Sequence, residues 1–157
     1  MALIFETKKF TVESHPEPFV SREEGGHIKI VAKRPVTDRT QFTPQEAIEF
    51  IRLSMIVGEA YKIAMNKQGV EIIHINYEEL GNWAFKRKEK PQFHLQIFGR
   101  VANAKKQVFP EAVYLPDRST GFYDGFKPLS GEDIKLIREE IERLFKEDKF
   151  QNANWTI

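Results

Sequence analysis

Three polar side chains alternate with apolar ones in the segment Gln92-Phe-His-Leu-Gln-Ile-Phe98. Alternation of this kind predicts a β-strand whose apolar residues face the core and whose polar residues share the opposite face. Gln92, His94 and Gln96 would then lie side by side, within reach of one ligand. A neutral imidazole can attack phosphorus, so His94 is a candidate nucleophile. A histidine between two glutamines can equally be a hydrogen-bonded structural residue.

Composition narrows the chemistry that this polar stripe could support. The 157 residues suit one domain, and 24 basic against 23 acidic side chains give a net charge of +1, which argues against a globally basic nucleic-acid binder. The absence of cysteine removes disulfides, thiolate nucleophiles and cysteine-ligated metals. Four histidines remain as candidates: His15, His27, His74 and His94. Their spacing matches no zinc motif, so we expect neither a metal nor a cofactor.

The chain shows no sign of a membrane or export segment. No apolar run approaches the length of a membrane span, and the first residues lack the charged-then-apolar order of a secretory signal. No repeat or low-complexity block divides the sequence. We therefore expect a cytoplasmic protein with no membrane partner and a single α+β domain over residues 1–157.

Apolar alternation and turn residues predict the strands. In Gly25-Gly-His-Ile-Lys-Ile-Val-Ala-Lys33 the side chains of His27, Lys29 and Val31 point to one face, opposite the apolar ones. The other predicted strands are Leu3–Phe5 and Phe10–Glu13, which form an opening hairpin, then Val70–Asn76, Gln92–Phe98 and a short strand near Ala112–Leu115.

Two capping boxes predict the helices. Thr43-Pro-Gln-Glu46 begins a long helix to about Gly69, which is apolar over most of its circumference and so offers surface for a sheet and for a partner subunit. Ser130-Gly-Glu-Asp133 begins a closing amphipathic helix. Between them, Asp117–Pro128 is an aromatic, glycine-rich loop that we expect to be ordered.

An ordered series of motifs gives the polar stripe a context. The series is Phe5-Glu6, Phe10-Thr-Val12, Pro18, Gly26-His-Ile-Lys-Ile-Val-Ala-Lys-Arg-Pro-Val36, Phe42-Thr-Pro-Gln-Glu46, Ile75-Asn76, Gly81 and Gln92-Phe-His-Leu-Gln-Ile-Phe-Gly-Arg100. It resembles the histidine triad superfamily of nucleotide-binding hydrolases and transferases, in a fragile-histidine-triad or nucleoside-phosphoramidase layout. The resemblance implies an α+β fold with a five-stranded antiparallel sheet, usually dimerised into a continuous ten-stranded one. It covers a core of about residues 3–100, so 101–157 would be a C-terminal extension.

The resemblance also assigns roles to individual residues. His94 matches the central histidine, which attacks the α-phosphate and forms a nucleotidyl-histidine intermediate. His27 matches a histidine that helps to orient this nucleophile, and Asn76 and Gly81 match positions that line the phosphates. The implied partners are a nucleotide or nucleotide-conjugate substrate and a second copy of the chain.

The outer triad positions depart from the histidines of the family, because they hold Gln92 and Gln96. An amide at Gln96 can donate a hydrogen bond but cannot give a proton to a leaving group, which disfavours poor leaving groups. Galactose phosphate uridylyltransferase, a relative within the superfamily, also has glutamine at the third position, which favours nucleotidyl transfer or phosphoanhydride cleavage. Gln92 would orient His94 less well than a histidine, which leaves open a site that binds without turnover.

Basic residues flank the predicted active strand. The run Lys86-Arg-Lys-Glu-Lys90 is either a solvated loop or a polyphosphate clamp in which Arg87, with Lys88 or Lys90, holds the distal phosphates. Arg100 is a weaker candidate for the same role.

The sequence therefore predicts a nucleotide hydrolase or nucleotidyltransferase that acts through His94. One alternative is a catalytically weakened nucleotide sensor. The other is a single-stranded nucleic-acid module that uses Lys86–Lys90 and the aromatic loop, against which the near-zero net charge argues.

Overall fold

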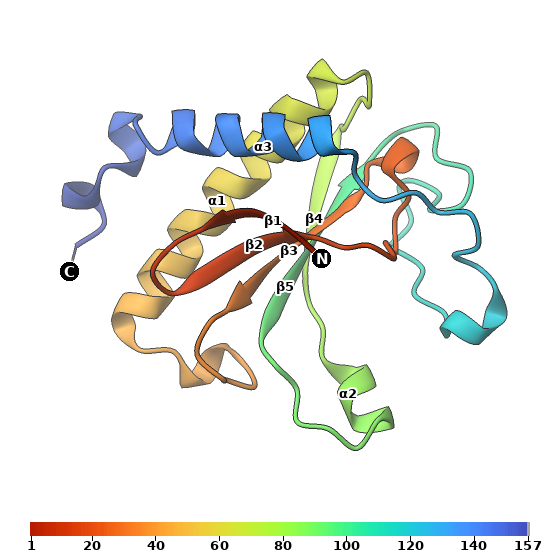
Figure 1. Cartoon of the computed structure of the whole chain (residues 1–157), viewed down its shortest axis with the longest axis horizontal. Coiled ribbons are helices and arrows are strands. Elements are labelled where there is room, and N and C mark those ends of the chain that lie inside the picture. The colour runs from red at the N-terminus through yellow and green to blue at the C-terminus, as the bar shows by residue number, and fades with distance from the viewer. Residues whose placement is uncertain (157) are drawn as a thin grey trace.

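Five antiparallel strands form one sheet in residues 1–156, the part of the chain that the computed structural model describes (Figure 1). They are β1 (Ala2–Glu6), β2 (Phe10–Ser14), β3 (His27–Ala32), β4 (His74–Glu79) and β5 (His94–Arg100). The order across the sheet is β1-β2-β3-β5-β4, which places the two strands of greatest interest, β3 and β5, next to each other inside the sheet. The predicted α+β fold with a five-stranded antiparallel sheet is confirmed.

One face of this sheet is apolar and carries the core. Alternate residues of the inner strands point to this face, and Val12, Ile30, Leu95 and Ile97 are each at most 4% exposed. Helices α1 (Pro44–Lys67) and α3 (Gly131–Leu144) cover this face, with α3 crossing α1 as Figure 1 shows. The long helix and the closing helix are therefore where the sequence predicted them.

Both helices begin at the predicted capping boxes. Thr43 Oγ1 accepts from the Glu46 N–H (3.2 Å), and the Glu46 carboxylate accepts from the Thr43 N–H (2.8 Å). In α3, Ser130 and Asp133 exchange the same two bonds. Asp133 also pairs with the Arg22 guanidinium (2.6 Å), which ties the start of α3 to the loop before β3. No helix in residues 1–156 combines the length and the apolar character that crossing a bilayer requires.

A close backbone contact between Gly25 and Gly99 joins the turn before β3 to β5. A Cβ at Gly25 would lie 2.1 Å from the Gly99 carbonyl oxygen, and Gly25 has a φ of 121°, which other residues rarely adopt. The Gly99 N–H donates to the neighbouring Gly26 carbonyl (3.2 Å). This contact lets β3 and β5 continue in register up to His27 and Phe98.

Two predicted strands differ from the structure, and one short helix was not predicted. The strand predicted at Val70–Asn76 begins only at His74, because residues 70–72 return to the end of α1, where the Asn66 side chain accepts from the Ile72 N–H (2.7 Å). No strand forms at Ala112–Leu115, since the Tyr114 backbone bonds the Gln107 side chain instead of a neighbouring strand. The short helix α2 (Asn82–Lys86) was not predicted.

Hydrogen bonds from two side chains hold the extension after β5 against the rest of the fold. The Glu24 carboxylate accepts from three successive backbone N–H groups, at Lys105, Lys106 and Gln107 (2.8–2.9 Å). Gln107 is 1% exposed, and its amide donates to the carbonyls of Phe19 (2.7 Å) and Tyr114 (2.9 Å). The extension is thereby held against the loop that contains Phe19.

Candidate functional site

The sheet face opposite the helices carries a cavity of about 460 Å³, within the range of small-molecule sites. Lys29 of β3 and His94 and Gln96 of β5 form its floor. It is covered by residues 80–92, which connect β4 to β5 and include α2; we call them the covering segment.

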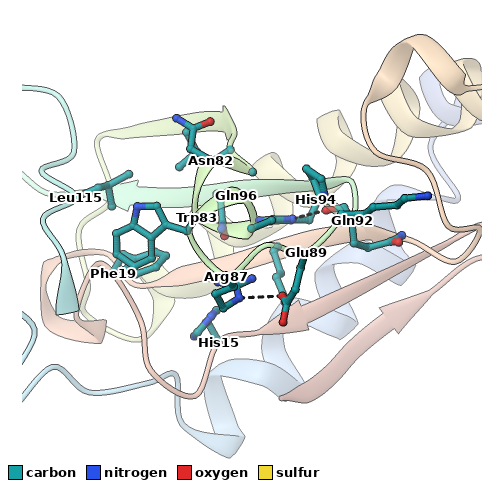
Figure 2. A pocket seen from close by; sticks show the side chains of 16 residues that line it. His15, Phe19, Asn82, Trp83, Arg87, Glu89, Gln92, His94, Gln96 and Leu115 are labelled. Carbon is teal, nitrogen blue, oxygen red and sulfur yellow. Dashed lines mark hydrogen bonds and ion pairs between the residues drawn. The ribbon is translucent and has the colours of Figure 1, made fainter. Parts of the chain in front are cut away.

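The two ends of the cavity differ in chemistry. Figure 2 shows His94 and Gln92 at one end. At the other end lie Phe19, Trp83 and Leu115. The cavity therefore has a polar end beside the start of β5 and an aromatic end built from three separate segments of the chain.

His94 is oriented by the backbone just before it. Its Nδ1 lies 2.8 Å from the Gln92 carbonyl oxygen, and a carbonyl only accepts, so Nδ1 donates and Nε2 keeps its lone pair. Burial lowers the pKa of His94; the bond to Gln92 opposes this, and the positive charge of Lys29 lowers the pKa further. The ring is therefore neutral at pH 7 and has an unprotonated Nε2.

Gln92 lines the cavity but does not belong to β5, which begins at His94. Its side-chain amide donates to the carbonyl oxygens of Ala32 (2.9 Å) and Arg34 (3.1 Å), at the end of β3. Gln92 thus fixes the entry to β5 and, through its own carbonyl, the ring of His94.

His27 lies beneath the cavity and is bonded to its floor. It is 1% exposed, and its Nδ1 accepts from the Phe19 N–H (3.3 Å), so the ring proton is on Nε2 and is donated to Gln96 Oε1 (2.5 Å). Burial lowers the pKa of His27 well below its ordinary value, although the hydrogen bond to Gln96 opposes this. The bond leaves the amide nitrogen of Gln96 as the end that can face a ligand.

His15, to which the sequence assigned no specific role, lines the same cavity. Its ring stacks on His27, with centroids 4.9 Å apart. Burial, with the charges of Lys29 and Arg118, lowers the pKa of His15 from 6.5 to about 4, so this ring is also neutral at pH 7. The signal in the sequence was its place directly after the strand that pairs with β3. In an antiparallel pair this position lies opposite His27.

Lys29 was placed on the correct face by alternation but was not recognised as a site residue. It lines the cavity, pairs with Gln96 in the β3–β5 register, and has a side chain only 15% exposed. Its ammonium lies 3.9 Å from the Glu13 carboxylate. The signal in the sequence was its spacing, because Lys29 follows His27 by two residues and side chains two apart on a strand share a face.

The covering segment contributes part of what the sequence predicted. Gly81 and Arg87 line the cavity, as does Lys90, whereas Lys88 does not. Arg87 pairs with Glu89 (2.9 Å), the contact drawn in Figure 2. Lys86, at the end of α2, forms an ion pair with Asp117 of the extension.

Two predicted phosphate-binding residues lie outside the cavity lining. Arg100 is 1% exposed, donates to Asn76 Oδ1 (2.7 Å), and reaches the carbonyl oxygens of Gln107 (3.2 Å) and Glu111 (2.9 Å). The guanidinium of Arg100 therefore holds the extension through these carbonyl oxygens, and Asn76 is its side-chain partner. The two residues predicted to contact phosphates are thus bonded to each other and lie away from the residues that line the cavity.

Residues 1–156 hold no group of three or more histidine, cysteine, aspartate or glutamate side chains placed to bind a metal ion.

The sequence matches no family model and no curated protein, but solved structures share its fold. A hypothetical histidine triad nucleotide-binding protein from Sulfolobus tokodaii is 17% identical, with a TM-score of 0.60 over 98% of this chain and 91% of that one. A histidine triad protein from Bradyrhizobium japonicum is 17% identical, with a TM-score of 0.57 over 90% and 88%. A zinc-bound histidine triad family protein from Mycobacterium smegmatis is 20% identical, with a TM-score of 0.53 over 90% and 84%.

These likenesses define the class of fold. The chain has the histidine triad fold over nearly its whole length, and the resemblance inferred from the order of the motifs is confirmed at that level. What the chain does with this fold has to be argued from its own residues.

Proposed function

We propose that this protein binds a nucleotide or nucleotide conjugate in the cavity and transfers its nucleotidyl group, to water or to an acceptor, through a covalent intermediate on His94. The observation that carries the proposal is the state of the His94 ring. Nδ1–H is fixed on the Gln92 carbonyl (2.8 Å), so the lone pair of Nε2 is the free end of a neutral ring in the cavity wall.

The reaction has two displacements. His94 Nε2 attacks the α-phosphorus, and the N–P bond forms as the bond to the leaving group breaks and its electron pair departs. Water or an acceptor hydroxyl then attacks the same phosphorus and gives up its proton to a neighbouring base, while the N–P bond breaks and returns its electron pair to Nε2.

The cavity supplies partners for the other parts of such a substrate. The amide nitrogen of Gln96 donates to an α-phosphate oxygen, since Gln96 Oε1 is engaged by His27. Arg87 and Lys90 on the covering segment offer positive charge to further phosphates. A base fits the aromatic end, where Trp83 is half-buried and lines the cavity.

Trapping of the intermediate tests this function. Incubation with an α-labelled nucleoside triphosphate or dinucleoside polyphosphate, followed by an alkaline quench, should give acid-labile label on the wild-type protein and none on His94→Ala. His74→Ala is the matched control, because His74 is exposed and does not line the cavity. Unchanged labelling or turnover in His94→Ala would remove the proposed nucleophile.

A nucleotide sensor is the second candidate. It is favoured by the amides at both outer positions, Gln92 and Gln96, because an amide can donate a hydrogen bond but cannot transfer a proton to the leaving group. Titration calorimetry separates the two functions. Submicromolar binding of a nucleoside triphosphate without hydrolysis over hours supports the sensor and contradicts the enzyme.

We also propose that the protein functions as a homodimer joined through β4 and α1. Strand β4 is at an edge of the sheet, where its outer backbone groups can pair with a second strand. Beside it, Ile51 (45% exposed) and Met55 (36%) lie one turn apart on α1, and Tyr77 (48%) reaches Gly58 on the same helix. Sedimentation should show a dimer that Met55→Glu dissociates; a wild-type monomer at high concentration would contradict this.

A further inference from the structure

The polar face of the sheet holds a cation that neither outer triad position provides. Lys29 of β3 lies directly opposite Gln96 of β5, and the next pair on the same face is Val31 opposite His94. Adjacent strands are about 4.8 Å apart, and pairs two residues along are about 7 Å apart. Lys29 is therefore a near neighbour of both the amide that cannot donate a proton and the proposed nucleophile.

The surroundings of Lys29 hold the ammonium loosely. Its counter-ion, Glu13 of β2, is at 3.9 Å, the longest of the ion pairs in residues 1–156. Burial lowers the pKa of Lys29, and the charge of Glu13 only partly opposes this. The other ionisable groups around it are the histidines of the cavity, Glu78 across β5, and the charged residues of the covering segment: His15, His27, His94, Glu78, Arg87, Glu89 and Lys90.

We propose that Lys29 is the acid that protonates the leaving group, taking the role that an outer histidine would have, so that this site can expel a basic leaving group despite the amide at Gln96. This rests on the proposed function, because it requires attack by His94. It also revises the expectation, drawn from Gln96 alone, that poor leaving groups are disfavoured.

The proton and electron pairs balance over the two displacements. As His94 Nε2 bonds to phosphorus, the bond to the leaving oxygen or nitrogen breaks with its electron pair, and that atom takes a proton from Lys29 Nζ. The neutral amine then accepts a proton from the attacking water, as the new P–O bond forms and the N–P bond breaks. Burial lowers the pKa of Lys29, which makes its ammonium a stronger acid than that of an exposed lysine and so suits proton transfer to the leaving group.

Two aryl esters that differ only by a para-nitro group test the proposal. The p-nitrophenyl ester of a nucleoside 5′-monophosphate has a leaving group that needs no proton, whereas the phenyl ester expels a much more basic phenolate. In single-turnover measurements of the first displacement, Lys29→Met should slow the release of phenol by about 10²-fold or more, in line with loss of a general acid, and the release of p-nitrophenol by less than about 5-fold. Lys29→Arg keeps the charge but not a transferable proton, so it should slow the phenyl ester alone.

A matched control is Glu78→Gln. Glu78 flanks Gln96 from β4, as Lys29 does from β3, and it is ionisable but does not line the cavity. It should slow both esters equally or not at all. If Lys29→Met prevents folding, Lys29→Arg, which retains the charge opposite Glu13, carries the comparison.

The outcomes separate this proposal from the proposed function. Equal slowing of the two esters by Lys29→Met, with both rates restored by Lys29→Arg, would mean that Lys29 supplies charge alone and would overturn the acid role. No effect of either variant would also overturn it. Cleavage of both esters by His94→Ala at the wild-type rate would overturn the nucleophile instead, and absence of cleavage by the wild-type protein would overturn both.

Discussion

The two faces of the sheet are formed by the same strands but satisfy their side chains in different ways. On the face under α1 and α3, Leu95 and Ile97 are buried against other apolar side chains. On the cavity face, His94 and Gln96 alternate with these apolar residues, and hydrogen bonds fix the orientation of the His94 ring and of the Gln96 amide. The first face stabilises the fold through burial of apolar side chains. The second fixes the orientation of polar groups that remain available for chemistry.

The sharpest test of this contrast uses two adjacent residues of β5. His94→Ala should lower turnover by more than about 10³-fold while changing the free energy of unfolding by less than about 1 kcal/mol, because the ring is partly exposed on the cavity face. Leu95→Ala should cost about 2–5 kcal/mol of stability, because it opens a void in the core. Urea unfolding and turnover of both variants measure the two effects. A large stability loss in His94→Ala would mean that the two faces are not distinct.

The buried bond between His27 and Gln96 should contribute to stability as well as to orientation. Gln96→Leu removes the acceptor of a buried N–H and should cost about 1–3 kcal/mol. The double variant His27→Phe, Gln96→Leu removes both partners, so it should be more stable than the sum of the single variants predicts. Chemical denaturation of all three variants measures this coupling, and strict additivity would show that the bond contributes nothing.

The neutral histidines of the cavity face predict a dependence of stability on pH. The pKa of His15 is about 4 in the folded protein against 6.5 ordinarily, so the unfolded chain takes up the proton first as the pH falls. The contribution of His15 to stability is therefore complete above pH 6.5 and decreases as the pH falls from there toward 4. His15→Gln should show a smaller decrease than the wild type between pH 7 and 5, a window above the titration of most carboxylates. Equal slopes for the two proteins would contradict this assignment.

The smallest expected effect is at the covering segment. Arg87→Ala should raise the KM for a nucleoside triphosphate by about 3–10-fold, with kcat and stability nearly unchanged, because Arg87 is exposed and pairs only with Glu89 in residues 1–156. Lys88→Ala is the neighbouring control, since Lys88 does not line the cavity. An equal rise in KM for both variants would indicate a general effect of charge and not a contact.

Local sequence signals predicted most of the fold. The two capping boxes located both long helices, and alternation predicted which side chains of β3 and β5 share a face. These features depend on neighbours within a few residues, so they can be read without knowledge of the rest of the chain. The strand predicted at Ala112–Leu115 failed because the buried amide of Gln107 supplies partners that a propensity argument does not include.

The candidate site was predicted only in part, because some of its residues are brought together by contacts between distant segments of the chain. His94, Gln92 and Gln96 are close in sequence, so their spacing was informative. Lys29 lies beside them because β3 pairs with β5, which is more than sixty residues further along the chain. Arg100 lies away from the cavity because its guanidinium donates to carbonyl oxygens of the extension.

The sequence by itself determined the face on which each strand residue lies, because side chains alternate along any extended chain. Only the tertiary structure decided which of the charged residues near that face reach the cavity. Lys29 does so through strand pairing, Arg87 through the path of the covering segment, and Arg100 is drawn away into a buried set of carbonyl oxygens. Strand register and the destination of a long side chain depend on contacts between distant segments, which no local pattern contains.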